Sequence, residues 1–214
     1  MSRGMPPLAA RLQASANEAL RLSEVIEVAK VEATSNSQTN RDLTVWKIYS
    51  VYELSYIKLF YLWEDFLESV FHRYMCGYTS SAYSPALIPG QSFSGSIASA
   101  EATLLNGRNY LLWHNCSYVI QRSQRFFVGC PIETVLSSNQ SRLGHLASIR
   151  HRIVHAQSDA KTNFDQATMS LSGKRYRGSR VGLFLRDYAP GVSPPTRWLT
   201  CLAQELTGMA NQIA

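Results

Sequence analysis

The sequence predicts an all-α fold, an antiparallel helical bundle that carries one small β-hairpin insertion. Two long stretches, Leu8 to Glu32 and about Leu43 to Met75, repeat apolar residues at the spacing of a helix face. Hydrophobic residues make up 45% of the 214-residue chain and charged residues only 17%, so a substantial core can form. We therefore expect one domain over residues 1–214.

Punctuating residues bound the first two helices. Pro6 and Pro7 precede the first helix, which suits the preference of proline for helix starts. Gly77 fits the end of the second helix, whose broad apolar stripe indicates a central position with neighbours on several sides. Residues 79–96 are rich in Ser, Pro and Gly, so we expect a loop there.

Helical patterns continue through the rest of the chain. One region covers about Ile97 to Phe127 with a break near Asn106-Gly107, and Pro131 opens a helix whose apolar stripe reaches Val154. A final amphipathic helix is expected over about residues 196–213.

The segment between the last two of these helices has a different composition. Met169 to Leu171 and Val181 to Leu185 have strand-like content, and the stretch Ser172 to Arg180 between them is basic and bounded by glycines. This pattern predicts a β-hairpin. We therefore expect residues 157–192 to form a basic hairpin or loop insertion before the final helix.

Positive charge is concentrated in one part of the chain. The whole sequence carries a net charge of +6, and the stretch from Arg150 to Arg186 has eight Lys or Arg and two acids, which leaves +6 as well. The other residues therefore sum to zero. Such a field predicts an anionic partner. The most hydrophobic stretch, Leu54 to Phe71, is too short and too charged to span a bilayer, so we expect no membrane association.

The cysteines and the N-terminus indicate a reducing environment. The four cysteines contain no C-x-x-C pair, which argues against a disulfide framework or a zinc ribbon and favours buried thiols. The first residues lack the apolar run of a signal peptide. A cytoplasmic location is therefore the expectation.

The candidate catalytic residues are Arg150, His151 and His155, which lie within six residues. Metal-independent RNA cleavage needs a base for the ribose 2′-OH, an acid for the departing 5′-oxygen and a cation for the phosphoryl oxygens. Histidine suits the two proton transfers because its pKa lies near neutrality. Arginine suits the phosphate because its planar fork stays charged.

Helix geometry places a condition on this site. On a regular helix His151 and His155 share a face, whereas Arg150 and His155 lie about 140° apart around the axis. One phosphate cannot easily contact both Arg150 and His155 of such a helix. Either the helix ends or bends near His155, or a second copy of the chain completes the site across a twofold axis.

The stretch Ile149 to Ala156 resembles the core motif of the HEPN superfamily, which comprises helical bundles that include many metal-independent endoribonucleases. That motif is Arg, then often Asn, Asp or His, then three residues, then His, and Arg150, His151 and His155 match it position by position. The resemblance implies a HEPN-like bundle that dimerises to form its active cleft.

A second stretch extends the resemblance. Tyr56 to Gly77 is similar to the long second helix of HEPN branches linked to prokaryotic defence and toxin systems. In those families an acidic or polar residue on this helix often faces the motif, which makes Glu64 or Asp65 the supporting candidate. Both are otherwise ordinary acids on a helix surface.

Simpler interpretations of these residues remain open. The motif cations could merely cap a helix end. His151 and His155 also have the spacing of a metal-ligand pair, with His145 as a third ligand, but no acid or cysteine stands close in sequence. We therefore expect no metal and no cofactor.

The basic segment supplies the candidate RNA-binding side chains. Its cations could track phosphates while its tyrosine stacks on a base, or they could form a solvated hairpin tip. The candidates are Arg152, Lys174, Arg175, Tyr176, Arg177 and Arg180.

These observations favour a homodimeric endoribonuclease that leaves 2′,3′-cyclic phosphate and 5′-hydroxyl ends, as a toxin or antiviral-defence effector. RNA is the expected substrate, and an antitoxin or regulatory protein is a possible partner. One rival is a non-catalytic HEPN domain that binds RNA or a partner protein. Another is a pure interaction module, such as the neutralised half of a two-component pair.

Overall fold

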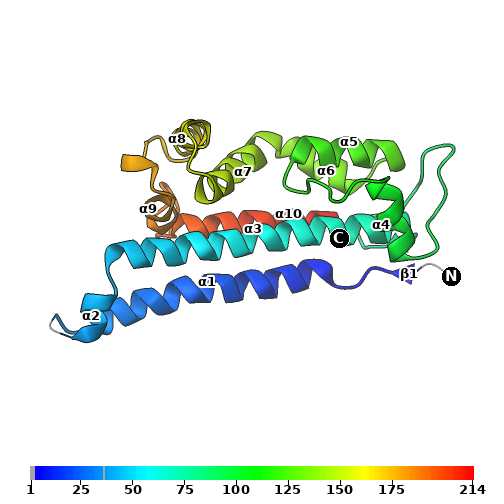
Figure 1. Ribbon diagram of the computed structural model, residues 1–214. Coiled ribbons are helices and arrows are strands. Elements are labelled where there is room, and N and C mark those ends of the chain that lie inside the picture. Colours follow the sequence, from blue (N-terminus) through cyan, green and yellow to red (C-terminus); the bar gives the residue numbers. More distant parts are fainter. Residues whose placement is uncertain (1–2, 36) are drawn as a thin grey trace. The chain divides into compact units, whose positions relative to one another are not determined.

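The computed structural model in Figure 1 describes residues 3–35 and 37–214, and over these residues it is mainly helical. The predicted all-α class is therefore confirmed. The helices are α1 (Leu8–Glu32), α2 (Gln38–Asp42), α3 (Val45–Met75), α4 (Ile97–Leu105), α5 (Cys116–Phe126), α6 (Pro131–Ser138), α7 (Gln140–Val154), α8 (Ser158–Ser172), α9 (Val181–Arg186) and α10 (Trp198–Ile213), with a 3-10 turn over Arg177–Ser179. Two short strands, β1 (Arg3–Gly4) and β2 (Tyr78–Thr79), pair in parallel.

The chain folds into two compact units, each assembled from separate stretches of sequence. Unit 1 comprises the chain up to Gln13, Trp63–Gly144 and Leu206–Ala214. Unit 2 comprises Ala14–Leu62 and His145–Glu205. The helices α1, α3, α7 and α10 each contribute residues to both units. The single HEPN-like domain over residues 1–214 stays a prediction.

Aromatic packing forms the core of unit 1. The ring of Phe71 on α3 meets Trp113 at a centroid distance of 5.6 Å and Phe127 at 5.1 Å, both edge to face. These ring contacts hold together three segments that are distant in the sequence. The Tyr74 hydroxyl donates a hydrogen bond to the carbonyl of Ile213, which ties the end of α10 to α3.

Close backbone packing holds α9 against α3 in unit 2. A Cβ atom at Gly182 would lie 2.4 Å from the carbonyl oxygen of Tyr49, so only glycine fits there. The amide of Gly182 also donates to the Glu53 carboxylate over 2.8 Å. The helix that follows the basic segment is therefore anchored by its backbone.

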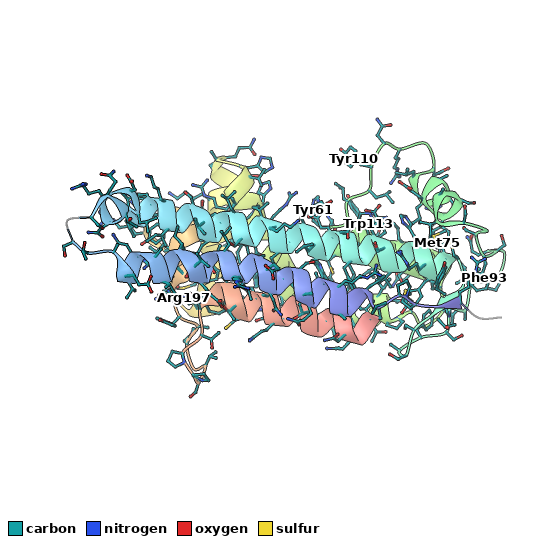
Figure 2. The ribbon with its side chains drawn as sticks, turned by 90° about the horizontal axis from the view of Figure 1, so that it is seen from below. Tyr61, Met75, Phe93, Tyr110, Trp113 and Arg197 are labelled. Atoms are coloured by element: carbon teal, nitrogen blue, oxygen red, sulfur yellow. The ribbon has the colours of Figure 1, made fainter. Side chains whose placement is uncertain are left out.

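The Glu27 carboxylate on α1 joins three other segments of unit 2. It accepts hydrogen bonds from Arg186 Nε at 2.7 Å and from the Tyr52 hydroxyl at 2.9 Å. Arg197, labelled in Figure 2, lies just before α10 with its Nη2 3.5 Å from the same oxygen. Burial alone would raise the pKa of Glu27, but these hydrogen bonds and positive charges together lower it.

The predicted β-hairpin insertion over residues 157–192 is wrong. This stretch contains α8, a 3-10 turn and α9, and Figure 1 draws α8 and α9 as coiled ribbons. In α8 the buried side chains recur at helical spacing, at Ala160, Phe164, Ala167 and Thr168. The strand interpretation depended on short windows of apolar and branched residues, and such windows do not distinguish a strand from a buried turn of helix.

The expected boundaries elsewhere are close to the observed ones. The predicted break near Asn106-Gly107 separates α4 from α5, and Asn106 adopts a left-handed conformation with φ of 44°. The helix that Pro131 opens is divided at Asn139 into α6 and α7. The β1–β2 pair joins residues that are too far apart in sequence for local patterns to reveal.

Two further expectations can be compared with the described residues. None of the described helices is both long and apolar enough to cross a lipid bilayer. In the described part of the chain no cysteine forms a disulfide. Cys76 and Cys130 are buried as expected, whereas Cys116 and Cys201 are only half-buried.

The Glu27 contacts predict a pH-dependent loss of stability in Glu27→Gln. At neutral pH this variant should lose about 1.5–3 kcal/mol of unfolding free energy, because charge-assisted hydrogen bonds are weakened. The folded-state pKa of Glu27 lies below its ordinary value of 4.5, so the stabilisation is complete above that value and is lost as the pH falls through the folded-state pKa. Urea unfolding of both proteins at neutral and acidic pH measures the difference.

The matched control is Glu24→Gln, which changes an exposed carboxylate on the same helix. It should alter stability by less than about 0.5 kcal/mol. A difference between wild type and Glu27→Gln that does not shrink on acidification would contradict the assigned role of the carboxylate.

Candidate active site

The C-terminal half of α7 positions the motif within unit 2. Leu146 and Ile149 are fully buried on one face of this helix. The Tyr56 hydroxyl on α3 donates a buried 2.8 Å hydrogen bond to the carbonyl of Leu146, one turn before Arg150. Arg150 and His151 follow directly after the buried face and are half-buried. The packing of α7 therefore determines where these two side chains project.

His151 and His155 form a pair at the end of the helix. The helix ends at Val154, but the amide of His155 still donates to the carbonyl of His151 over 2.9 Å. Their imidazole rings lie 4.5 Å apart between centroids with an angle of 42° between planes, and both side chains are half-buried. Two adjacent imidazoles can serve as a general acid and a general base toward one substrate.

Arg152, a predicted RNA-binding residue, caps this helix end. Its Nη1 donates a 3.3 Å hydrogen bond to the carbonyl of His155. A cation at this position satisfies an exposed carbonyl and interacts favourably with the helix dipole. Arg152 thus takes part in capping this helix end.

The predicted supporting acids Glu64 and Asp65 belong to unit 1, whereas Arg150, His151 and His155 belong to unit 2. Within unit 1, a carboxylate oxygen of Glu64 lies 3.6 Å from His114 Nδ1. The approach of either acid to Arg150 stays a prediction.

Tyr176 does not present its ring to solvent, so the interpretation that it stacks on an RNA base is wrong. The side chain is only 6% exposed, and its ring packs edge to face on Phe184 at 5.2 Å. Its hydroxyl donates to Asp187 over 2.9 Å. Lys174 bonds to the same carboxylate at 2.6 Å. These contacts fold the basic segment back onto unit 2.

The other cations of the segment differ in their surroundings. The Arg180 guanidinium lies 4.0 Å from the ring centroid of Trp46, which is a cation–π contact. Arg175 and Arg177 are exposed, and neither forms an ion pair in the described part of the chain. These two arginines are the segment's best candidates for contact with phosphates.

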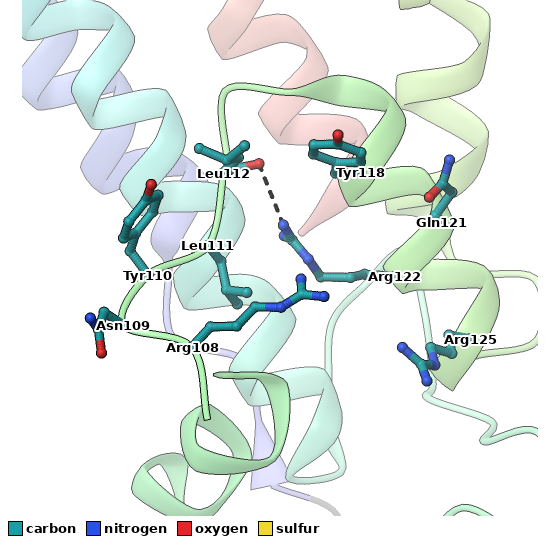
Figure 3. Close-up of a pocket in the computed structure, with 9 residues that line it drawn as sticks. All are labelled: Arg108, Asn109, Tyr110, Leu111, Leu112, Tyr118, Gln121, Arg122 and Arg125. Carbon is teal, nitrogen blue, oxygen red and sulfur yellow. Dashed lines mark hydrogen bonds between the residues drawn. The ribbon is translucent and has the colours of Figure 1, made fainter. Parts of the chain in front are cut away.

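Sequence reasoning missed a further group of cations. Arg108, Arg122 and Arg125 line a cavity in unit 1, shown in Figure 3. The stretch 106–126 contains these three arginines and no acid, and that local excess is the signal that could have revealed them.

The described residues 3–35 and 37–214 contain no group of three or more His, Cys, Asp or Glu side chains that could hold a metal ion. No family model, curated protein or solved structure matches the chain. The HEPN resemblance therefore rests on the motif and the helix order of this chain.

Proposed function

We propose that this chain is a metal-independent endoribonuclease of the HEPN type, which acts as a homodimer with a composite active site. The observation that carries the proposal is the His151–His155 pair, with ring centroids 4.5 Å apart at the end of α7. Arg150 stands next to this pair in the chain. Together they are the residue types that RNA transesterification requires.

In the proposed reaction, His155 is the main acid and base. As a base it takes the proton of the ribose 2′-OH, whose oxygen forms a bond to the adjacent phosphorus. The bond from phosphorus to the 5′-oxygen breaks, and a protonated histidine gives its proton to that leaving oxygen. The products are a 2′,3′-cyclic phosphate and a 5′-hydroxyl. His151 shares the proton transfers or positions the substrate.

Arg150 has the role of holding the phosphoryl oxygens, whose charge increases as the bonds exchange. Because α7 is regular through Val154, Arg150 and His151 project at the angles expected of a helix. Helix α7 ends at Val154, so helix geometry does not fix the angle between Arg150 and His155. The proposed site combines Arg150 of one protomer with His155 of its partner.

The proposed biological role is that of a toxin or antiviral-defence effector, and it rests on the family resemblance. An RNA-cutting enzyme harms its own cell unless it is restrained. An antitoxin or another regulatory protein is therefore the proposed partner.

Wild-type protein should cleave single-stranded or structured RNA in the presence of EDTA. His155→Ala should lower the cleavage rate by about 100-fold or more, because it removes a general acid and base. Arg150→Ala should cause a similar loss of about 100-fold, since it removes the cation at the phosphate. Direct labelling of the products by polynucleotide kinase, without phosphatase treatment, checks for 5′-hydroxyl ends.

The controls are Gln157→Ala and Lys161→Ala, which replace exposed residues near the motif. Both should cleave at the wild-type rate. Equal cleavage by wild type and His155→Ala would overturn the assignment. RNA binding without any cleavage by wild type would favour the non-catalytic alternative.

Mixing two inactive variants tests the composite site. Arg150→Ala and His155→Ala chains, mixed in equal amounts and allowed to exchange, should form mixed dimers with one intact site each. Half of the dimers are then mixed, and each of these has one intact site of two, so the mixture should have about a quarter of the active sites of an equal amount of wild type. The cleavage rate after exchange measures this recovery. No recovery, with mixed dimers verified by differential tagging, would contradict a site shared in this way.

Removal of Arg175 and Arg177, exposed arginines of the basic segment that have no ion pair among the described residues, should weaken RNA binding without abolishing folding. In Arg175→Ala/Arg177→Ala the slope of log affinity against log salt should fall by about 1.4, because two phosphate contacts to a single strand are lost. Titration of a 2′-O-methyl RNA over a range of salt concentrations measures the slope. The control Arg21→Ala/Lys47→Ala removes two exposed cations outside the basic segment and should leave the slope unchanged. An unchanged slope in the first variant would refute its predicted contacts.

A further inference from the structure

A cavity in unit 1 has the size of a small-molecule site. Its volume is about 680 Å³, and it is lined by the loop after α4 together with one face of α5. Figure 3 shows both sides, with Arg108 extending from the loop and Arg122 from the helix. Pockets of about 300–1,000 Å³ are typical of sites for ligands and cofactors.

The charge of the cavity is positive and poorly compensated. Arg108, Arg122 and Arg125 line it, and no described residue in its lining is acidic. Arg108 and Arg125 are exposed, and in the described part of the chain neither forms an ion pair. An anion at this position would therefore meet guanidinium groups that have no acidic partner.

Arg122 is held in place by two residues of the loop between α4 and α5. Its guanidinium lies 4.7 Å from the ring centroid of Trp113 and donates to the carbonyl of Leu112 over 3.5 Å, the bond drawn in Figure 3. Its Nη1 is buried and has no hydrogen-bond partner in the structure. The side chain is thus pre-positioned at little further entropic cost.

The electrostatic surroundings of Arg122 are unfavourable for a bare cation. Burial lowers the pKa of this guanidinium, and the like charge of Arg108 lowers it further. Glu68 acts in the opposite direction, but its effect is smaller than that of Arg108, and it does not line the cavity. A bound anion would relieve the repulsion between the two arginines.

The remaining lining favours a planar polar group beside the anion. Tyr110 is 72% exposed and Tyr118 is 47% exposed, so both rings are available to a ligand. Asn109 and Gln121 add side-chain amides, which can donate and accept hydrogen bonds at the edge of a base. Figure 3 shows Tyr110 on the loop and Tyr118 on the helix.

We propose that this cavity binds a nucleoside phosphate, with the phosphate on Arg108, Arg122 and Arg125 and the base against Tyr110 or Tyr118. The same chemistry occurs in a free mononucleotide and at the phosphorylated end of an RNA strand. The site lies in unit 1, separate from the catalytic motif in unit 2, so it adds a binding function to the proposed one.

Isothermal titration calorimetry of the full chain tests this site. The probes are the four ribonucleoside 5′-monophosphates, the matching nucleosides and inorganic phosphate. At least one monophosphate should bind about tenfold more tightly than its nucleoside and than inorganic phosphate, because only the monophosphate uses both the arginines and the rings. Equal binding of inorganic phosphate and monophosphates, or no binding of any monophosphate, would overturn the proposal.

Variants assign the binding to this cavity. Arg108→Ala/Arg125→Ala should weaken monophosphate binding by about tenfold or more, and Tyr110→Ala/Tyr118→Ala by about fivefold or more. Arg11→Ala, which removes an exposed cation of unit 1 outside the cavity, should bind like wild type. Thermal melting verifies that each variant is folded. Unchanged affinity in the folded arginine variant would refute the site.

A pair of short 2′-O-methyl oligonucleotides distinguishes the two sources of the ligand. If the 5′-phosphate raises the affinity of the oligonucleotide and Arg108→Ala/Arg125→Ala removes that gain, the cavity accepts strand ends. If the 5′-phosphate leaves the affinity of the oligonucleotide unchanged while a monophosphate binds, the cavity takes free nucleotides, and either outcome supports the proposal. The measurement uses the His155→Ala chain, so it is independent of whether the protein cleaves RNA.

Discussion

The Glu27 carboxylate accepts hydrogen bonds from two helices at once, and the arrangement of unit 2 depends on this contact. Arg186 of α9 and Tyr52 of α3 donate to it, and Arg197 adds a positive charge from the segment before α10. Burial disfavours the ionised form of this carboxylate, and these donors more than offset that effect, so its pKa is lowered. Burial and the same carboxylate raise the pKa of Tyr52, so its hydroxyl stays a donor. Helices α3 and α9 and the segment before α10 are thus joined by one group on α1.

Contacts between residues far apart in the sequence explain why the long helices could be predicted and the segment after the motif could not. The apolar repeat of Leu8 to Glu32 extends over many turns, so its helical period is clear from the sequence, and α1 has those bounds. The stretch Val181 to Leu185 is too short for its period to decide between strand and helix. Its conformation depends on Gly182, whose backbone meets Tyr49 and Glu53, residues more than a hundred positions earlier. No local pattern contains that information.

The candidate site shows the same division between local and distant information. The sequence places Arg150, His151 and His155 near a helix end, and the structure brings the two imidazoles together there because α7 continues to Val154. The sequence alone could not show that Arg152 caps this helix end. Four residues that are or can be positively charged lie there, and the structure is needed to show that Arg152 donates to the carbonyl of His155. The burial of Tyr176 was equally hidden, because its partners Phe184 and Asp187 come from α9 and the residue after it.

The positive charge of the chain illustrates how a sum along the sequence differs from a field in space. Between Arg150 and Arg186 the cations exceed the acids by six, yet Lys174 and Arg186 pair with acids and Arg180 lies on an indole ring. The rest of the sequence sums to zero, yet it contains a cavity with three arginines and no acid in its described lining. An anion binds best to cations that have no acidic partner. Where a cation is already paired with a carboxylate, the anion must displace that carboxylate, and the exchange contributes little binding free energy. Arg175 and Arg177 in unit 2, and Arg108 and Arg125 in unit 1, satisfy that condition. The position of a bound anion should therefore depend on the cations that are accessible in the fold more than on the net charge of the chain.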